Sequence, residues 1–305
     1  MITASEKIWM DGKMVAWGEA KIHVLTHALH YGTGVFEGIR AYETKEGSAI
    51  FRLPEHVRRL FDSAKALSIK MPFSEKEISD AIIAVVRDNK LSSCYIRPIV
   101  FLAYGSQGLN PIGVPVSVSI AAWPWGAYLG EEGVKKGIRA KVSSFTRHHV
   151  NIAMTRAKIT GNYVNSCLAK QEVVAAGYDE AFMLDVDGYV AECTGENIFV
   201  IRDGRIKTPG FTSFLPGITR DSVQALAKDE RLEIGEGRIT RDDLYMADEI
   251  FLTGTAAELT PVREVDDRAI GTGKPGPITV KLRELYNKAI HGELEKHKAW
   301  LTMVK

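Results

Sequence analysis

The sequence contains little cysteine and no long hydrophobic run. Cys94, Cys167 and Cys193 are the only cysteines among 305 residues, too few and too scattered for a disulfide framework or a four-thiolate zinc site, which indicates a reducing compartment. No stretch approaches the ~20 apolar residues needed to span a bilayer, and the N-terminus lacks the features of a signal peptide. We therefore expect a cytoplasmic protein with no membrane partner.

Neither sign of charge is in excess. The chain has 39 Lys and Arg against 38 Asp and Glu, a formal net charge of +1. Such a balance creates no overall positive potential that would attract nucleic acid, although it still permits a local basic pocket. Hydrophobic residues make up 45% and charged residues 25% of the chain, which excludes collagen-like and disordered classes and favours a small-molecule partner.

The length predicts two domains. A segment rich in Gly and aromatic residues, WPWGAYLGEEGVKKG, shows no sustained period and marks the junction between them. We predict a smaller α+β domain over residues 1–124, an interdomain loop over 125–136, and a larger, β-barrel-like α/β domain over 137–305.

Local signals place the main elements. Asp11-Gly12 supplies the positive φ angles of a tight hairpin turn, Pro54 opens a helix, and Ser74 begins another with capping-box spacing. Further strands are predicted at residues 35–42, 49–53, 94–104, 114–123, 138–145, 180–185, 197–202, 232–239 and 249–253, and further helices at 162–176, from 217 and from 278 to about 296.

Two patterns resemble sites that their surroundings do not support. Residues 271–276, GTGKPG, match the GxGxxG dinucleotide pattern, but too little chain follows for the second strand with its ribose-binding acid, so a loop is the better interpretation. His23, His27 and His30 share helical spacing but lack a neighbouring acid, which favours hydrogen-bonded histidines over a metal site. A serine-nucleophile elbow and a Walker motif are absent.

Lys158 is a candidate reactive residue. It lies in AMTRAKITGNY between a predicted strand and a predicted helix, where desolvation and Arg156 both oppose its positive charge. A neutral amine can form a Schiff base, whereas the default for any single lysine is a solvated surface position.

Three further segments add to this chemistry. Glu192, on a strand after a turn, could be held inward to pair with a heterocyclic nitrogen, whereas the default for any single carboxylate is a surface position. Residues 215–221, LPGITRD, start a helix whose backbone N–H groups suit an anion, and the small residues after Thr253 let backbone amides approach a ligand closely. With Arg58 these segments form a candidate phosphate cradle, so the set contains the parts that pyridoxal phosphate requires.

With these residues the chain resembles the branched-chain aminotransferases, which belong to the class IV (fold type IV) pyridoxal-phosphate enzymes. The resemblance covers nearly the whole chain, through motifs in the family's order: IWMDG at 8–12, HALHYG at 27–32, VFEGIR at 35–40, YIRP at 95–98, GNY at 161–163, GEN at 195–197, LPGITR at 215–220 and GTAAE at 254–258. It implies an α+β or α/β fold of two domains with the active site in the cleft between them.

The resemblance also implies the cofactor contacts. Lys158 would form the Schiff base with pyridoxal 5'-phosphate and later move the proton between Cα and C4′, and Glu192 would pair with the pyridine nitrogen. Tyr163 would donate to the ring's 3′ oxygen, and Leu215 would pack on the ring. The residues around the phosphate would be Arg58, Gly217, Ile218, Thr219 and Thr255.

Substrate contacts are implied in the same way. Tyr95 and the amides of Ala256 and Ala257 would hold the α-carboxylate, and Arg97 would meet the distal carboxylate of glutamate. Further substrate-binding positions would be Tyr31, Phe36, Gly38, Trp125, Tyr128 and Tyr163. Burial of an aliphatic side chain among aromatic rings contributes about 25 cal/mol per Å², and a single guanidinium can pair with the acid that takes its place.

The expected activity is that of the family: reversible transfer of the amino group of L-leucine, L-isoleucine or L-valine to 2-oxoglutarate, giving the 2-oxo acid and L-glutamate by a ping-pong mechanism. The family's members are dimers or larger, so we expect a homodimer or homohexamer in which loop 104–110 lines the neighbouring subunit's pocket. The chain lacks the redox CxxC of the longer animal enzymes, and Gln107 and Arg147-His148-His149 have no assigned role.

Alternatives with the same fold are a D-amino-acid aminotransferase, an R-selective amine transaminase and an aminodeoxychorismate lyase, which share the lysine and the ring-binding acid. Tyr95-Ile96-Arg97 and residues 255–257 favour the branched-chain enzyme. A relative that carries the cofactor without turnover has no support in the sequence, because every catalytic part is present.

Overall fold

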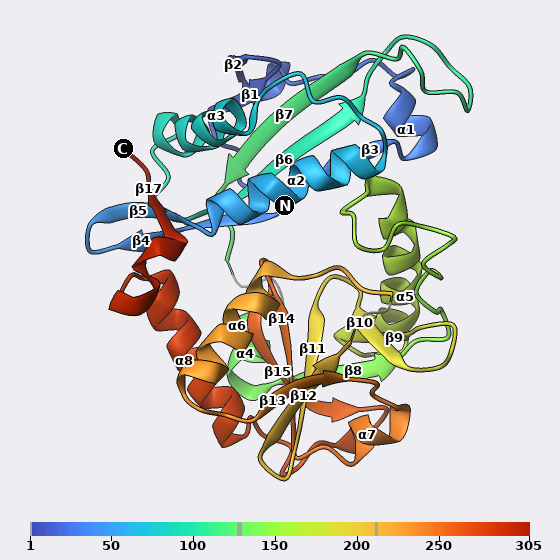
Figure 1. Cartoon of the computed structure of the whole chain (residues 1–305), viewed down its shortest axis with the longest axis vertical. Helices are drawn as coiled ribbons and strands as arrows, with labels where there is room; N and C mark the ends of the chain where they lie inside the picture. The colour runs from blue at the N-terminus through green and yellow to red at the C-terminus, as the bar shows by residue number, and fades with distance from the viewer. Residues whose placement is uncertain (1, 127–129, 211–212) are drawn as a thin grey trace. The chain divides into compact units, whose positions relative to one another are not determined.

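A computed structural model describes residues 2–126, 130–210 and 213–305 (Figure 1). The chain forms two compact units, each built from separate stretches of sequence. The first comprises Met1–Trp125, Ala157–Asn162 and Ala289–Lys305, and the second comprises Gly126–Arg156 and Tyr163–Lys288. Within the described ranges, no helix is both long enough and apolar enough to cross a membrane.

The first unit contains an eight-stranded antiparallel sheet. Its strands follow the order β17-β5-β4-β6-β7-β1-β2, and β3 pairs with β6. The strands are β1 (Lys7–Met10), β2 (Lys13–Ala16), β3 (Gly34–Phe36), β4 (Ile39–Thr44), β5 (Gly47–Phe51), β6 (Cys94–Leu102), β7 (Val116–Trp123) and β17 (Leu301–Met303).

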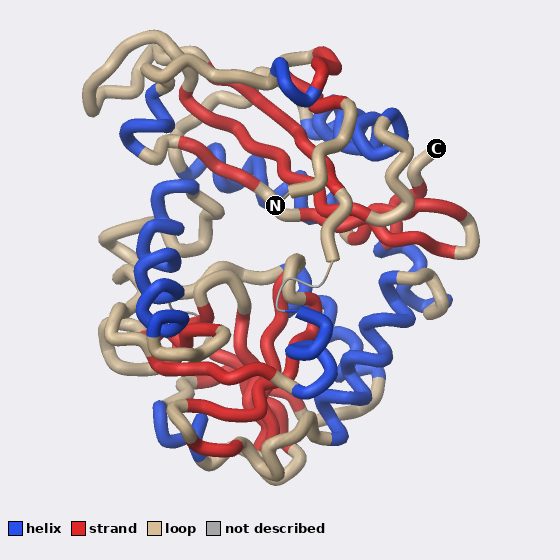
Figure 2. Tube along the Cα trace, turned by 180° about the vertical axis from the view of Figure 1, so that it is seen from behind, coloured by secondary structure: helices blue, strands red, loops and turns tan. Residues whose placement is uncertain are grey.

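Two helices, α2 (Leu53–Ala66) and α3 (Glu75–Asp88), pack together against this sheet (Figures 1 and 2). Each has an apolar face that is buried against the strands. The Ser74 side chain accepts a hydrogen bond from the amide of Glu77, and the Glu77 carboxylate accepts one from the amide of Ser74, which confirms the predicted capping box. The unit also contains α1 (His27–Tyr31), η1 (Trp17–Glu19), η2 (Thr160–Asn162) and η3 (Glu295–Trp300).

The predicted N-terminal hairpin is confirmed, since Asp11 and Gly12 both have positive φ angles between β1 and β2. The single strand predicted over 35–42 is wrong, because Glu37-Gly38 divides it into β3 and β4. At this break the Glu37 side chain is fully buried in an ion pair with α2.

The C-terminal helix is shorter than predicted. Helix α8 (Pro277–Ile290) ends before Gly292, whose φ of +74° is left-handed and does not continue a helix. The chain then forms η3 and β17, and β17 pairs with β5. Sequence patterns do not predict this pairing, because a three-residue strand carries almost no periodic signal.

The second unit contains a nine-stranded, mostly antiparallel sheet. Its order is β10-β9-β8-β15-β14-β11-β12-β13, with β16 paired to β15. The amide of Val190 in β10 donates to the carbonyl of Ile239, just after β13, at 2.8 Å, so the two ends of this order are linked as in a barrel. The strands are β8 (Ile138–Val142), β9 (Glu180–Leu184), β10 (Val190–Cys193), β11 (Asn197–Arg202), β12 (Arg205–Pro209), β13 (Ile234–Gly237), β14 (Glu249–Gly254), β15 (Glu258–Val265) and β16 (Arg268–Ala269).

The helices of this unit are α4 (Gly130–Lys136), α5 (Tyr163–Ala175), α6 (Ile218–Asp229), α7 (Arg241–Tyr245) and most of α8. Helix α4 corrects the prediction of a loop throughout 125–136. Lys136 donates to Glu132 one turn earlier, a local pairing that favours a helix even though Gly residues weaken the periodic pattern.

The GTGKPG segment at 271–276 is a loop before α8, as predicted. A Cβ on Gly276 would lie about 2.1 Å from the Glu249 side chain, so close packing explains this glycine. The Glu249 carboxylate also accepts hydrogen bonds from the amides of Ile278 and Thr279, and so fills the helix N-terminus that a dinucleotide phosphate would need.

The segment that carries Lys158 belongs to the first unit, which corrects the prediction of a second domain over 137–305 with this lysine in it. The amide of Phe36 donates to the Lys158 carbonyl at 3.0 Å, and the Lys158 amide donates to Ser63 Oγ at 3.0 Å. A Cβ on Gly32 would lie 2.8 Å from Gly161 Cα, so the two backbones also touch. Long-range hydrogen bonds, rather than position in the chain, therefore decide where this segment packs.

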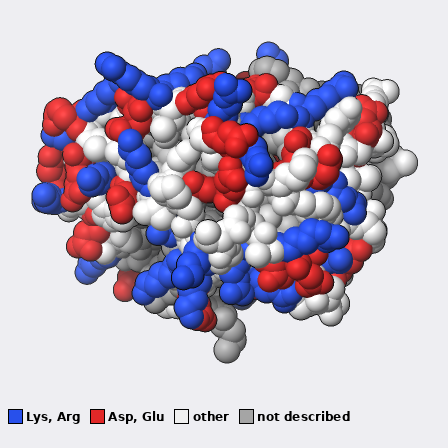
Figure 3. All heavy atoms as spheres, turned by 90° about the horizontal axis from the view of Figure 1, so that it is seen from below, with Lys and Arg blue, Asp and Glu red and all other residues white. Residues whose placement is uncertain are grey.

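Basic and acidic side chains are interspersed over the face shown in Figure 3. This pattern agrees with the formal net charge of +1.

Candidate active-site residues

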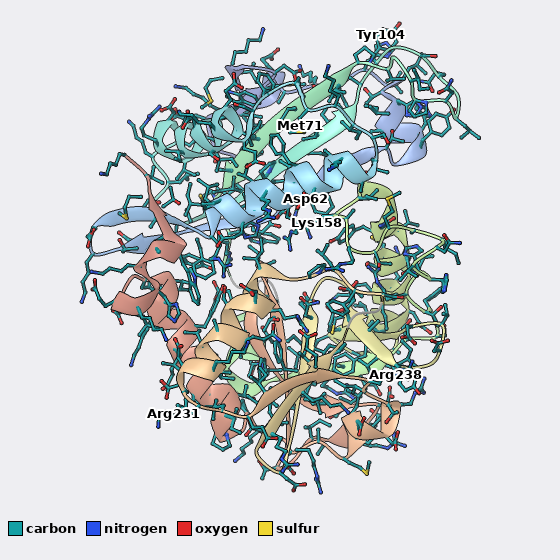
Figure 4. The ribbon with its side chains drawn as sticks, viewed as in Figure 1. Asp62, Met71, Tyr104, Lys158, Arg231 and Arg238 are labelled. Carbon is teal, nitrogen blue, oxygen red and sulfur yellow. The ribbon has the colours of Figure 1, made fainter. Side chains whose placement is uncertain are left out.

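In the first unit Lys158 is half-buried beside α2 (Figure 4). Its Nζ lies 4.8 Å from the centroid of the Phe36 ring. Its backbone is held on one side by β3 and on the other by Ser63 of α2. The amine therefore projects from a fixed backbone over an apolar surface.

Arg97 lies among aromatic rings in the same unit. Its guanidinium carbon is 4.7 Å from the centroid of Phe36, and its NH2 donates to the hydroxyl of Tyr95 at 2.9 Å. A Cβ at Gly38 would lie 2.1 Å from that hydroxyl oxygen, so glycine is required to leave room for it. The structure thus brings together four of the predicted substrate residues, namely Phe36, Gly38, Tyr95 and Arg97.

Trp125 extends this aromatic group. Its ring is 4.5 Å from that of Tyr95, edge to face, and its carbonyl accepts a hydrogen bond from Arg40 at 3.1 Å. Tyr31 is 41% exposed on α1 and lies against His27. Tyr128 lies outside the described residues.

The predicted phosphate residue Arg58 is exposed on α2. Its neighbour Arg59 is on the helix face that carries Ser63, and it donates to the Glu37 carboxylate from Nε at 2.6 Å and NH2 at 2.9 Å. His56, one turn earlier, places Nδ1 2.7 Å from the same carboxylate. The face of α2 that borders Lys158 therefore presents Arg59 and not Arg58.

Glu37 is ionised within this group. Burial would raise the pKa of its carboxyl, but the nearby charge of Arg59 and the hydrogen bonds from Arg59 and His56 hold the pKa well below its ordinary value. Burial lowers the pKa of His56, against the opposing charge of Glu37.

In the second unit Glu192 on β10 is held at both carboxylate oxygens. Oε1 lies 2.6 Å from NH2 of Arg147, and Oε2 accepts a hydrogen bond from the amide of Leu215 at 3.1 Å. Arg147 in turn donates to Asn165 and Ser166 of α5, both at 3.2 Å.

Several of the other predicted cofactor residues lie near one end of the paired strands β11 and β14. Asn197 and Thr253 are opposite each other, so the start of β11 and the end of β14 meet there. Asn197 donates to the carbonyl of Leu215 at 3.0 Å, and a Cβ on Gly217 would lie 2.0 Å from Asn197 Oδ1. Asn197 therefore fixes the turn that leads into α6.

Helix α6 begins at Ile218, and its N-cap residue, Gly217, has no side chain that could accept a hydrogen bond from the first amides of the helix. Its first amides, together with the buried Thr219, suit an anion. The three-residue turn Thr255–Ala257 joins β14 to β15 at the same end of these strands, and Thr260 Oγ1 donates to the Ala257 carbonyl at 2.7 Å. Tyr163 is the half-buried first residue of α5.

The histidines predicted to be hydrogen-bonded do not lie on one helix, because α1 starts at His27 and excludes His23. His27 has Nδ1 2.7 Å from Thr33 Oγ1 and Nε2 2.8 Å from the carbonyl of Gly108. Within the part of the chain that the structure describes, no three His, Cys, Asp or Glu side chains are grouped to hold a metal ion.

Each unit carries groups that pyridoxal phosphate requires: the first has an amine over an apolar face, and the second has a buried carboxylate and a helix start that suits a phosphate. A family model described as amino-transferase class IV matches residues 34–265. The chain belongs to this family. Both the predicted fold type IV and the predicted cofactor are thereby confirmed, and the aminotransferase uses pyridoxal phosphate.

Individual relatives of this aminotransferase are similar over nearly their whole length. It is 56% identical over 298 residues to the branched-chain-amino-acid aminotransferase of Pseudomonas aeruginosa, covering 98% of this chain and 97% of that protein. It is 47% identical over 302 residues to the enzyme of that name from Escherichia coli K12, covering 98% of each. The structure of the T.th. branched-chain amino acid aminotransferase with pyridoxamine 5'-phosphate matches with a TM-score of 0.97 at 54% identity, covering 100% of both chains.

Three residues of these groups are not predicted from the sequence. From the sequence, Arg58 is predicted to hold the phosphate instead of Arg59. The spacing of four between Arg59 and Ser63 places these two residues on one helix face and could have indicated Arg59. Asn197 stands in a family motif without a role, and Arg147 lies in a segment without periodicity. Only tertiary contacts show what the last two hold.

Proposed function

We propose that this aminotransferase reversibly transfers the amino group of L-leucine, L-isoleucine or L-valine to 2-oxoglutarate in a ping-pong sequence. The observation that carries the proposal is Arg97 against the rings of Phe36 and Tyr95. Aromatic faces favour an aliphatic side chain, and one guanidinium among them suits the distal carboxylate of glutamate.

When bound, pyridoxal phosphate supplies an aldehyde for the amino group and a ring that accepts electrons from the Cα–H bond. Lys158 would hold the proton taken from Cα and return it, because its half-buried amine projects over the apolar ring of Phe36. Glu192 holds the ring nitrogen in its protonated form, and Tyr163 donates to the ring oxygen. Leu215 packs on the ring.

The phosphate is held by the amides at Gly217 and Ile218, by Thr219 and by Thr255. Arg59 replaces Arg58 in this role, since it borders the Lys158 segment whereas Arg58 is exposed. The substrate's α-carboxylate is bound by the hydroxyl of Tyr95 and the amides of Ala256 and Ala257. Tyr31, Gly38, Trp125 and Tyr128 complete the substrate-binding positions.

We also propose that the enzyme is a homodimer or homohexamer and acts in the cytoplasm. Loop 104–110 and its surroundings support contact with a second copy, because several large apolar side chains there are exposed. Leu109 is 87% exposed and Ile112 is 85% exposed, and Tyr104 lies where β6 leads into the loop (Figure 4). Exposed apolar side chains in one region favour a protein interface.

The decisive assay mixes the purified protein, pyridoxal phosphate and 2-oxoglutarate with L-leucine or with D-alanine. Glutamate should form with L-leucine, and Lys158→Ala should abolish its formation. Transfer from D-alanine without transfer from L-leucine would overturn the proposal in favour of a D-amino-acid enzyme.

A further inference from the structure

Arg147 and Glu192 form an ion pair that is buried at both ends. Their closest atoms are 2.6 Å apart, and the two side chains are only 7% and 6% exposed. Arg139 and Glu264 in the same unit are also 2.6 Å apart, yet their side chains are 32% and 26% exposed. A buried pair costs much more to desolvate than an exposed one, so it is weak evidence for a purely stabilising role.

We propose that Arg147 is a positioning residue that keeps Glu192 ionised and directed at the pyridine nitrogen. This inference rests on the proposed role of Glu192.

The surrounding hydrogen bonds make the guanidinium rigid. The amide of Arg147 donates to the carbonyl of Leu184 in β9, and NH1 donates to Asn165 and Ser166 of α5. Two elements thus fix Arg147, and Arg147 with the Leu215 amide fixes the carboxylate. Such support by neighbouring groups holds a functional side chain in one orientation.

The acid groups near Glu192 oppose its ionisation. Glu180 and Glu196 are both buried close to β10, and Lys170 pairs with Glu180 at 2.6 Å. Burial and the charges of Glu180, Glu196 and Glu192 raise the pKa of the Cys193 thiol. Arg147 is a cation in direct contact with Glu192, and its charge offsets that of Glu180, whereas Glu196 is largely protonated below about pH 8.

One proton is then shared between Glu192 and the ring nitrogen. In a buried site the neutral arrangement, with the proton on the carboxyl group, competes with the ionic one, with the proton on nitrogen. The charge of Arg147 contacts the carboxylate directly and therefore favours the ionic arrangement. Without it, the proton should move from nitrogen to oxygen, and the ring should accept electrons less readily.

The experiment compares the holoenzyme with Arg147→Met, each reconstituted with pyridoxal phosphate labelled with ¹⁵N in the ring. The nitrogen chemical shift reports directly where the proton lies. We expect the protonated value in the unaltered enzyme and a shift toward the unprotonated value in Arg147→Met, with the half-reaction with L-leucine slowed about tenfold or more. Arg139→Met is the matched control, and it should retain the protonated value.

Arg147→Gln keeps a hydrogen-bond donor without the charge, and it replaces Arg147→Met in the experiment if the latter fails to fold. Its nitrogen signal should also move toward the unprotonated value. A protonated nitrogen in a folded Arg147 variant would overturn the inference. Glu192→Gln tests the role of Glu192 separately from the role of Arg147. An unchanged nitrogen signal in Glu192→Gln would refute the proposed role of Glu192 itself, whereas a change there but not in the Arg147 variants would refute only the role of Arg147.

Discussion

A Cβ atom at Gly38 would lie 2.1 Å from the hydroxyl oxygen of Tyr95. Gly38 lies in the break between β3 and β4, and Tyr95 lies in β6 of the same unit. The Tyr95 hydroxyl also accepts a hydrogen bond from Arg97. A side chain at position 38 must therefore displace the Tyr95 hydroxyl and disturb the Arg97 contact with it.

Gly38→Ala should raise the KM for both amino-donor and amino-acceptor substrates, because Tyr95 is proposed to bind the carboxylate that they share. Overpacking of this kind costs about 1–3 kcal/mol, so the protein should still fold. Steady-state kinetics with L-leucine and 2-oxoglutarate measure the effect. Gly18→Ala is the control, since a Cβ there has no neighbour within 4 Å; equal KM values in the two variants would contradict the prediction.

Arg97→Leu should separate the two halves of the reaction. Glutamate loses the partner of its distal carboxylate, so its half-reaction should slow about a hundredfold while that of L-leucine changes much less. Single-turnover measurements with each amino acid test this. Arg87→Leu, on the exposed side of α3, serves as the control, and equal slowing of both half-reactions by Arg97→Leu would count against its role in specificity.

Arg59→Ala and Arg58→Ala should differ sharply. Loss of Arg59 leaves the buried carboxylate of Glu37 without its bidentate partner, which costs about 3–5 kcal/mol, and it should also weaken retention of pyridoxal phosphate. Arg58 is exposed, so Arg58→Ala should change neither the free energy of unfolding nor the retention of pyridoxal phosphate. Urea unfolding and the dissociation constant of the cofactor measure the two effects. The assignment fails if Arg58→Ala loses the cofactor and Arg59→Ala keeps it.

Glu196 should make stability depend on pH. Burial, followed by the charge of Glu180, raises the pKa of this carboxyl from about 4.5 to about 8. The folded state therefore binds a proton that the unfolded state has lost, and the contribution of this group to stability falls as pH rises from about 4.5 to about 8. The free energy of unfolding of Glu196→Gln, relative to that of the unaltered protein, should increase over this interval and level off above it. Urea titrations at pH 5, 6, 7, 8 and 9 measure the difference, and a difference independent of pH would refute the shift.

The elements that can be predicted from the sequence are those whose cause is local. Asp11-Gly12 makes its own turn, and Ser74 with Glu77 makes its own cap. The break at Glu37 could not be predicted, because its cause is an ion pair with a helix about twenty residues away. Local rules contain no information about such partners.

The candidate site shows the same limit. Motifs point to Lys158 and Glu192, whereas they do not separate Arg58 from Arg59, because adjacent arginines differ only by the phase of their helix. The contact of Ser63 with the Lys158 segment makes that phase clear. Arg147 has no pattern at all and is recognisable only by its contact with Glu192.

The first unit is assembled from three stretches, and its last strand, β17, includes Met303. During synthesis, β5 therefore gains its outer neighbour only after Leu301–Met303 have left the ribosome. A gene divided after residue 125 would likewise produce an N-terminal fragment whose sheet lacks both β17 and the stretch that bears Lys158. Such a fragment could regain its complete sheet only by association with the C-terminal fragment.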